Sequence, residues 1–469
     1  MLHAQFPGSH LTLKDVKNER LAIRKSELGG YSATQALVRL LEQEGITHFV
    51  KYRDDRVTGL LIIFPWCLTM WKLFPDALMI DDTYKTNRFK MPLFNVTGIS
   101  NIGSIFNAAF GLLDGEDEDE FTWAVEKLEE IRQSYNIQQP FVVLTDMERA
   151  LKNALGRIWP DAQQQLCLWH ICQHVALEAK KRWKGPRGAP SANAPSANAP
   201  SASARSANAP SASARSASAR SANAPSASAP LANAPLANAP SASAPSASAP
   251  SASINEALLA TTSRDQQPLE AVPTPPDIPH TPQGLTMLWK CAVQAPREEE
   301  FEEAWARILQ EFPEQEAIIE YIVNTWFPWR RQFLNCYTSQ YRNHGIRVTS
   351  RVESSHAEIK SYLYNGQADL LFLIQSIQQM LTNKQREYDA QIELERARIR
   401  CGFEKLAWLG ELRHKVSKKG LDLIYKQWLI TKPFIRQNRP QPPYTGRFEA
   451  PYSLPCRHKV EEAIMTQPL

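Results

Sequence analysis

The sequence predicts an α/β fold that is interrupted by a helical insertion and by a disordered repeat. In the first half of the chain, apolar β-prone runs alternate with segments whose apolar residues recur at helical spacing. Apolar residues make up 43% of the 469 residues, which is enough for a substantial core. Residues 189–253 instead repeat a five-residue Ala/Pro/Ser pattern without any aromatic residue. Such a tract buries too little apolar surface to offset its ordering entropy, so we expect disorder there.

Three β-prone runs come first, at residues 77–85, 93–100 and 104–113. The sequence Asn101-Ile102-Gly103 between the second and third runs is typical of a turn. Because the runs follow one another so closely, we expect three antiparallel strands.

Helices and strands then alternate. Apolar residues from Phe121 to Ile131 and from Leu151 to Ile158 recur on one helical face in each segment. Residues 141–145 form a short apolar run between these helices, and residues 165–170 are expected to form a fifth strand. The order of three strands, helix, strand, helix, strand is that of a ribonuclease-H-like α/β domain.

The remaining segments are assigned by composition. We divide the chain into an N-terminal lead-in (1–66), the first part of the α/β core (67–184), the repeat and its linker (185–284), a helical insertion (285–345), a helix that completes the core (346–382), a basic helical tail (383–439) and a C-terminal segment (440–469).

Three acidic positions stand where apolar surroundings discourage charge. Asp81 and Asp82 end the first strand, Asp146 follows the fourth, and Glu353 begins a helical pattern after the fifth. An ionised carboxylate at the edge of a core is costly unless a positive charge compensates it. A site whose ligands are all carboxylate oxygens suits Mg²⁺ or Mn²⁺. A metal site of this kind indicates metal-assisted phosphoryl transfer on nucleic acid. Neighbouring strand residues point to opposite faces, so only Asp81 or Asp82 can join it.

Each acid also has an ordinary explanation. Asp146 could form a turn or cap a helix, Glu353 could pair with Lys360 or Arg351, and Asp81 could begin a turn. Their occurrence together, in this order of elements, favours the catalytic interpretation.

Charge and cysteine content narrow the class of protein. The net charge of +4 and the isoelectric point near 8.6 are too mildly basic to identify a nucleic-acid partner by themselves. The acidic run at residues 114–120 is typical of a solvated loop and helix start. Seven scattered cysteines without a secretory signal favour a reducing compartment. The apolar stretch at 60–71 is too short for a bilayer, so we expect no membrane association.

Basic residues near the insertion are candidate DNA contacts. Arg330, Arg331 and Arg342 lie among aromatic residues such as Trp329, and Arg351 lies beside Glu353. Aromatic residues at helical spacing are more often core than DNA contacts, whereas the arginines suit phosphate.

Four motifs resemble the Mutator-like element (MULE) transposase domain, which is also found in plant far-red-impaired-response proteins. Asp81-Asp82-Thr83-Tyr84-Lys85-Thr86-Asn87 resembles its Asp-x-Thr-Tyr-x-Thr-Asn motif, and Leu144-Thr145-Asp146 its second acid. Cys167-Leu168-Trp169-His170 matches its Cys-x-x-His element, and Arg351-Val352-Glu353-Ser354 its third-acid helix. The resemblance covers roughly residues 74–176 and 298–381.

The resemblance implies a DDE-type transposase that cleaves and transfers DNA strands at element ends. The catalytic, metal-binding residues would be Asp81, Asp146 and Glu353, with Asp82 at the variable position, and Mg²⁺ or Mn²⁺ as the cofactor. The implied partner is DNA carrying terminal inverted repeats, and the protein would be a homo-oligomer in the nucleus. The alternative is a non-catalytic DNA-binding regulator, or a decayed copy, derived from such a transposase.

Two cysteine and histidine pairs are candidate zinc ligands. Cys456 and His458 resemble part of the SWIM zinc finger that often follows this domain, but Tyr444 stands where a cysteine is expected. Cys167 and His170 form the second pair, and a buried cysteine with a hydrogen-bonded histidine is equally common in a core. Two ligands do not complete a tetrahedral zinc site.

Overall fold

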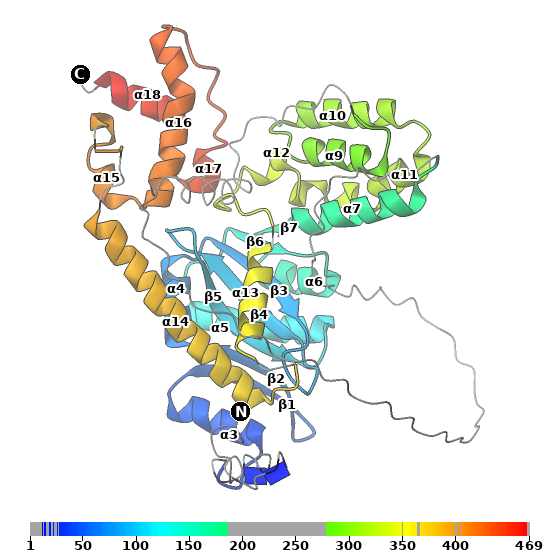
Figure 1. Ribbon diagram of the computed structural model, residues 1–469, viewed down its shortest axis with the longest axis vertical. Helices are drawn as coiled ribbons and strands as arrows, with labels where there is room; N and C mark the ends of the chain where they lie inside the picture. Colours follow the sequence, from blue (N-terminus) through cyan, green and yellow to red (C-terminus); the bar gives the residue numbers. More distant parts are fainter. Residues whose placement is uncertain are drawn as a thin grey trace, which may run out of the picture. The chain divides into compact units, whose positions relative to one another are not determined.

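The computed structural model of the chain describes residues 28–185 and 278–466, except 349, 364–365, 399–401 and 405, together with scattered positions before residue 28. The repeat at 189–253, predicted to be disordered, lies outside the described residues. The described part is a mixed α/β structure built around one sheet (Figure 1), so the predicted α/β class is confirmed.

The sheet has seven strands in the order β1-β2-β5-β4-β3-β6-β7. All pairs among strands β1 to β5 are antiparallel. Strand β6 runs parallel to both of its neighbours, β3 and β7. The strands are β1 (Thr47–Arg53), β2 (Arg56–Ile63), β3 (Ala77–Thr83), β4 (Leu93–Ile99), β5 (Ile105–Leu113), β6 (Val142–Thr145) and β7 (Gln163–Leu166).

The N-terminal lead-in contains structure that the sequence analysis did not assign. Helix α3 (Ala33–Gln43) begins at a capping box formed by Ser32 and Gln35, and β1 and β2 form a hairpin that extends the sheet. The hairpin turns at Asp54 and Asp55, which have φ angles of 50° and 58°. Aspartate tolerates this left-handed conformation better than most residues, which makes the pair a suitable hairpin turn.

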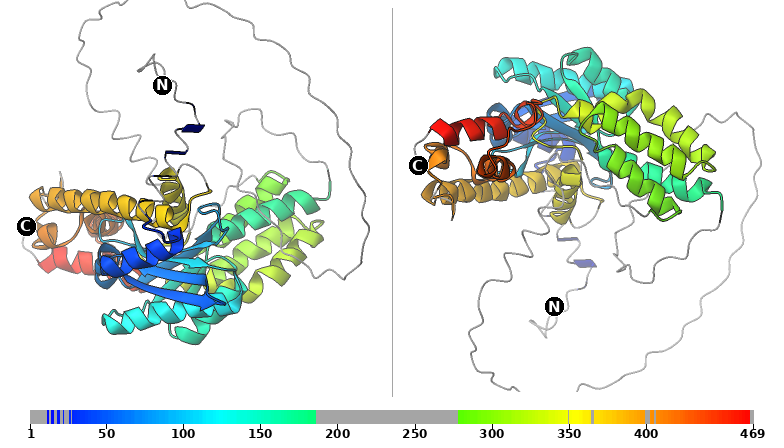
Figure 2. Two further views of the ribbon diagram at one scale, coloured as in Figure 1. Left: turned by 90° about the horizontal axis from the view of Figure 1, so that it is seen from below. Right: turned by 90° about the horizontal axis from the view of Figure 1, so that it is seen from above.

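Helices cover both faces of the sheet (Figure 2). On one face lie α5 and α6, and on the other α13 and α14. The further helices are α4 (Pro65–Leu73), α5 (Glu118–Ser134), α6 (Arg149–Ile158), α7 (Leu168–Arg182), α9 (Pro282–Ala292), α10 (Glu298–Glu311), α11 (Glu316–Thr325), α12 (Asn335–Thr338), α13 (Ser350–Ser361), α14 (Leu370–Ala397), α15 (Leu412–Lys415), α16 (Lys418–Arg436), α17 (Glu449–Tyr452) and α18 (Arg457–Thr466), with 3₁₀ turns η1 (Phe327–Gln332) and η2 (Ala407–Leu409).

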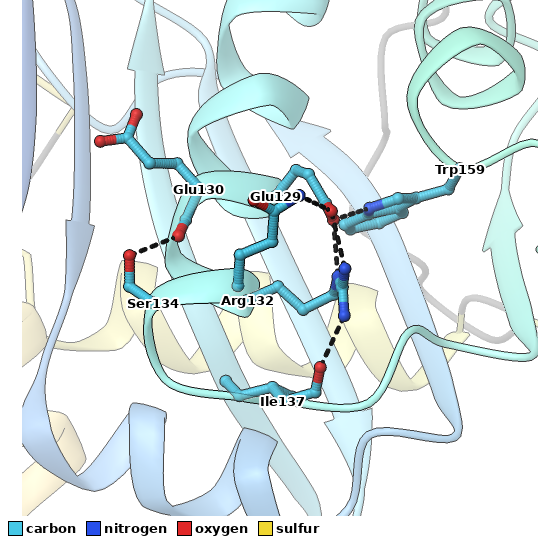
Figure 3. Close-up of polar contacts among 7 residues, drawn as sticks. Glu129, Glu130, Arg132, Ser134, Ile137 and Trp159 are labelled. Carbon is cyan, nitrogen blue, oxygen red and sulfur yellow. Dashed lines mark hydrogen bonds and ion pairs between the residues drawn. The ribbon is translucent and has the colours of Figure 1, made fainter.

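A polar network fixes the ends of α5 and α6 (Figure 3). The Arg132 guanidinium donates to both carboxylate oxygens of Glu129, at 2.6 and 2.7 Å, and to the Ile137 carbonyl at 2.8 Å. The indole Nε1 of Trp159 donates to the same Glu129 carboxylate at 2.7 Å. These bonds hold the pKa of Glu129 at about 2, chiefly because Arg132 stabilises the ionised carboxylate.

The helical insertion has a core of its own. Helices α7, α9, α10 and α11 pack around buried aromatic residues that include Trp289, Phe301 and Trp326. The expectation that aromatic residues near the arginines belong to the core is therefore confirmed for Trp326. At the base of the insertion, the backbone of Lys184 donates to Gln315 at 3.0 Å, and Gln315 donates back to the Lys184 carbonyl at 2.8 Å.

The expected fifth strand is shorter and starts earlier. Strand β7 ends at Leu166, and Leu168 begins α7, so His170 lies on a helix rather than on the predicted strand at 165–170. The side chains of α7 that face the insertion decide this outcome, because Ile171, Val175 and Ala179 are buried there at helical spacing.

Candidate functional site

Strand β3 directs its two aspartates to opposite faces of the sheet. Asp81 pairs with Asn95 of β4, whose amide donates to Ser355 of α13 at 3.3 Å. Asp82 pairs with Phe94, whose ring packs against α5. Because paired residues of adjacent strands share a face, Asp81 lies on the α13 face and Asp82 on the α5 face.

Asp146 lies at the end of the strand next to β3. The parallel strand β6 pairs Leu144 with Met79, so the chain leaves the sheet beside Asp81. The Oδ1 atom of Asp146 accepts the backbone N–H of Glu148 at 3.1 Å, and the N-cap of α6 is Glu148. Of the two ordinary explanations of Asp146, the helix N-cap is therefore wrong, whereas the bond to Glu148 is typical of a turn-forming aspartate.

A buried polar network holds α13 against the sheet. The amide of Asn107 donates to Asn95 at 2.9 Å and to the Ser355 hydroxyl at 3.0 Å. All three residues are buried, and Val352 packs with Met79 on the same face. This network fixes the first turns of α13, which carry Glu353.

Glu353 faces His170 of α7. Its Oε1 atom lies 3.5 Å from Nε2 of His170. The side chain of Arg351, one of the two partners in the ordinary explanation, lies outside the described residues. Burial lowers the pKa of His170, but the Cys167 thiol and the charges of Asp81 and Asp146 more than offset this and raise it to about 9. His170 is thus a cation among these acids at neutral pH.

The charges of the other two predicted acids act on Asp81. Burial first, and then the charges of Asp146 and Glu353, raise the pKa of Asp81 to about 7, although His170 opposes them. The charges of Asp146, Glu353 and His170 all reach Asp81, and Glu353 itself contacts His170, which the sequence had indicated only as half of a zinc pair.

Asp82 lies in a second acidic group on the α5 face. Burial, followed by the charge of Glu116, raises its pKa well above the ordinary value, and Glu148 contributes in the same direction. Its Oδ1 atom is buried without a hydrogen-bond partner in the part of the chain that the structure describes. Tyr84 donates to Glu116, and burial and this bond raise the pKa of Tyr84. The acidic run at 114–120 was expected to be solvated. The sequence did not indicate that the charge of Glu116 acts on Asp82.

The donor set around Asp81 fits a hard divalent cation. Its ligands would be carboxylate oxygens, and a cation would relieve the repulsion that raises the Asp81 pKa. Within residues 28–185 and 278–466, apart from the gaps given above, no three His, Cys, Asp or Glu side chains are already arranged to hold a metal ion. Binding would therefore require these side chains to turn toward a common point.

Of the other predicted ligands, Cys456 and His458 lie near each other in the C-terminal segment, whereas the Cys167 thiol bonds to His170. The Sγ atom of Cys456 is 3.8 Å from Nδ1 of His458, whose Nε2 contacts the Pro442 carbonyl at 2.8 Å. Cys167 is buried at the start of α7, one turn before His170.

The predicted phosphate contacts are dispersed. Arg330 and Arg331 lie on η1, and Arg331 stacks 5.7 Å from the Tyr337 ring. Arg342 pairs with Asp76 at 3.7 Å. Arg351 belongs to α13, but its side chain lies outside the described residues.

The fold and the acids define an α/β domain with clustered carboxylates at the ends of two parallel strands and on a helix packed across them. Residues 77–174 match the family model of the MULE transposase domain, so the chain contains a MULE transposase domain.

Several curated proteins are similar to the chain. A protein of Chaetomium globosum named PKS-NRPS hybrid synthetase cheA is 28% identical over 473 residues, which cover 97% of this chain and 8% of that protein. FAR1-RELATED SEQUENCE 5 of Arabidopsis thaliana is 28% identical over 134 residues, covering 27% of this chain and 16% of that protein. FAR-RED IMPAIRED RESPONSE 1 of the same plant is 24% identical over 102 residues, covering 22% and 12%.

The chain thus spans 16% or less of the length of these three relatives. The domain match supports a transposase-derived protein. No helix in the described ranges is both long and apolar enough to cross a membrane.

Proposed function

We propose that the chain is a DDE-type transposase of a Mutator-like element, which cleaves and transfers DNA strands at the ends of that element. The observation that carries the proposal is the placement of Asp146 at the end of the strand beside Asp81, with Glu353 on the helix packed over that face, where the charges of both acids act on Asp81. The MULE domain match over residues 77–174 supports it independently.

The proposal includes a ribonuclease-H-like core made of β3 to β7. Its support is the strand order β5-β4-β3-β6-β7, with the first three strands antiparallel and the last two added in parallel. Strands β1 and β2 would then be an extension at the β5 edge.

In this proposal Asp81, Asp146 and Glu353 hold Mg²⁺ or Mn²⁺. The bound metal would polarise the phosphodiester and activate water or a 3′-hydroxyl. His170 would orient Glu353 through their 3.5 Å contact, and its positive charge would offset the crowding of the carboxylates. Asp82 takes no part, because it lies on the opposite face.

DNA carrying the terminal inverted repeats is the proposed partner. Arg330, Arg331 and Arg342 would contact phosphates, and Arg351 would join them beside Glu353. The protein would act in the nucleus as a homo-oligomer.

One observation favours the alternative, a non-catalytic DNA-binding regulator or decayed copy. Among the residues whose positions are given, no three potential ligands are already arranged to bind a metal. The two functions differ in strand chemistry and not in DNA binding, so one experiment separates them.

The experiment incubates the purified chain with Mg²⁺ or Mn²⁺ and DNA carrying the terminal repeats that flank its gene. We expect nicked or joined products from the wild type and none from Asp146→Asn, which removes a charge while keeping the shape. The matched control is Asp161→Asn, at an exposed aspartate between α6 and β7, which should keep full activity.

Both variants should bind the DNA as tightly as the wild type. Binding without strand chemistry under either metal would refute the enzyme and leave the regulator. Cleavage by Asp146→Asn would show that the site lies elsewhere.

A further inference from the structure

A cavity of about 460 Å³ lies between α16, the segment around α17 and the start of α10. None of its lining residues belongs to the acidic site described above. Its volume falls within the roughly 300–1,000 Å³ typical of small-ligand sites. The chemistry of its walls therefore indicates what it would hold.

The charged side chains in the lining are mostly basic. Arg297, Lys426, Arg447 and Arg457 face the cavity together with a single acid, Glu300. Glu300 lies 2.6 Å from the Arg297 guanidinium, so its charge is already compensated. Arg447 and Arg457 favour an anionic ligand, because guanidinium groups suit phosphate in particular.

One wall of the cavity is aromatic. Tyr444, Phe448 and Tyr452 line it, and the Phe448 and Tyr452 rings lie 5.2 Å apart at an angle of 38°. A base stacked on an aromatic side chain gains about 1–3 kcal/mol, whichever base it is. Phosphate-binding cations beside such a wall match the two halves of a nucleotide.

The walls are held in place by the protein itself. Glu449 accepts from the Tyr444 hydroxyl, pairs with Lys459 at 2.8 Å and accepts the backbone N–H of Cys456 at 3.4 Å. The Pro451 carbonyl accepts the backbone N–H of His344 at 3.0 Å, which ties this segment to the insertion. A preformed cavity avoids much of the ordering cost of binding.

We propose that this cavity binds a nucleotide, with its phosphate beside Arg447 and Arg457 and its base against the aromatic wall. The source is either a free nucleotide or the phosphorylated end of a DNA strand, because both present the same chemistry. The site does not depend on the proposed strand chemistry at Asp81, Asp146 and Glu353.

The test measures binding of two fluorescent probes to the full chain in the presence of EDTA, which suppresses any metal-dependent cleavage. One probe is methylanthraniloyl-labelled dAMP, and the other is a six-nucleotide single strand with a 5′-phosphate and a 3′ dye. We expect Arg447→Met to weaken binding about tenfold, since one charge-assisted phosphate contact is lost. Arg157→Met removes an arginine that pairs with Glu118 at 2.7 Å outside the cavity, and should leave binding unchanged.

The site is supported if Arg447→Met weakens the binding of either probe while Arg157→Met does not. The probe that binds more tightly shows whether the ligand is a free nucleotide or the phosphorylated end of a DNA strand. Arg457→Met provides a second cavity variant in case Arg447→Met impairs folding, which the melting temperature reports. The proposal is overturned if the wild type binds neither probe, or if the folded cavity variants bind as tightly as Arg157→Met.

Discussion

The Nε2 atom of His170 lies 3.5 Å from the Oε1 atom of Glu353, and this contact joins the first turn of α7 to the first turn of α13. The two helices belong to different parts of the chain, one leading into the insertion and the other returning from it. A histidine whose charge acts on Asp81 is thereby placed at the point where these parts meet.

His170 should matter for activity and not for DNA binding. His170→Gln removes the positive charge that lowers the pKa of Asp81 and leaves Glu353 without its partner. Under the proposed function we expect strand cleavage to fall about tenfold or more, with unchanged DNA affinity. His174→Gln, one turn further along α7, is the matched control. Equal activity of both variants would mean that His170 has no role in positioning Glu353.

The Ser355 network should contribute to stability. Ser355→Ala removes the acceptor of the buried Asn95 amide, and an unpartnered buried polar group costs about 1–3 kcal/mol. We expect the free energy of unfolding in urea to fall by that amount. Ser361→Ala, at an exposed serine on the same helix, should change it by less than about 0.5 kcal/mol. A similar small change in both variants would show that the network does not hold α13.

Lys152 should make stability depend on alkaline pH. It is 5% exposed, bonds to Gln164 and Gln332, and lies 4.8 Å from the Trp329 ring centroid. Burial lowers its pKa from 10.5 to about 8. The unfolded chain binds this proton more tightly, so the free energy of unfolding should rise between pH 8 and 10.5.

Relative to Lys152→Met, we expect the wild type to gain up to about 3 kcal/mol over that range. Urea titrations at pH 7 and pH 10 measure the gain. Lys72→Met, at an exposed lysine on α4, controls for the general effect of alkaline pH. If the wild type gains as much free energy of unfolding relative to Lys72→Met as relative to Lys152→Met, groups other than Lys152 cause the effect.

Glu449 should hold the C-terminal segment in place without zinc. Although burial raises its pKa, the bonds from Lys459 and Tyr444 lower it to about 2. Its stabilising effect is therefore present above about pH 4.5 and is lost as the pH falls toward 2. At neutral pH we expect Glu449→Gln to accelerate tryptic cleavage at Arg447, and Glu462→Gln to leave the rate unchanged. If a zinc chelator accelerates cleavage of the wild type instead, Cys456 and His458 bind zinc after all.

Deleting residues 189–253 should leave the melting temperature nearly unchanged. The tract offers no core residues, and loop-closure cost rises only logarithmically with length. Calorimetry of the full and the shortened chain measures the difference. A large loss of stability would mean that the tract packs against the folded part.

The central strands and helices could be predicted because their apolar patterns are strong. Strands β3, β4, β5 and β6 and helices α5 and α6 lie close to their expected ranges. Strand β1 was missed because it is an edge strand that carries His48, Lys51 and Arg53, so its apolar pattern is weak. Strand β7 was misplaced because three glutamines begin it, and the apolar residues after it belong to α7.

The acids of the site could be named from local motifs, but the contacts that position them could not. The bond between Asn95 and Ser355 joins residues 260 positions apart, and no local pattern marks either partner. The choice between Asp81 and Asp82 likewise needed the register between β3 and β4. The role of His170 beside Glu353 needed the contact between α7 and α13, which depends on tertiary packing.

The paired hydrogen bonds between Lys184 and Gln315 close the described chain on either side of the repeat. We therefore expect that slippage during DNA replication adds or removes repeat units without changing the stability of the folded domain. Among copies of this gene, tract length would drift as a nearly neutral character and record their descent, while substitutions at Gln315, whose side chain makes both bonds to the Lys184 backbone, would remain under selection for folding.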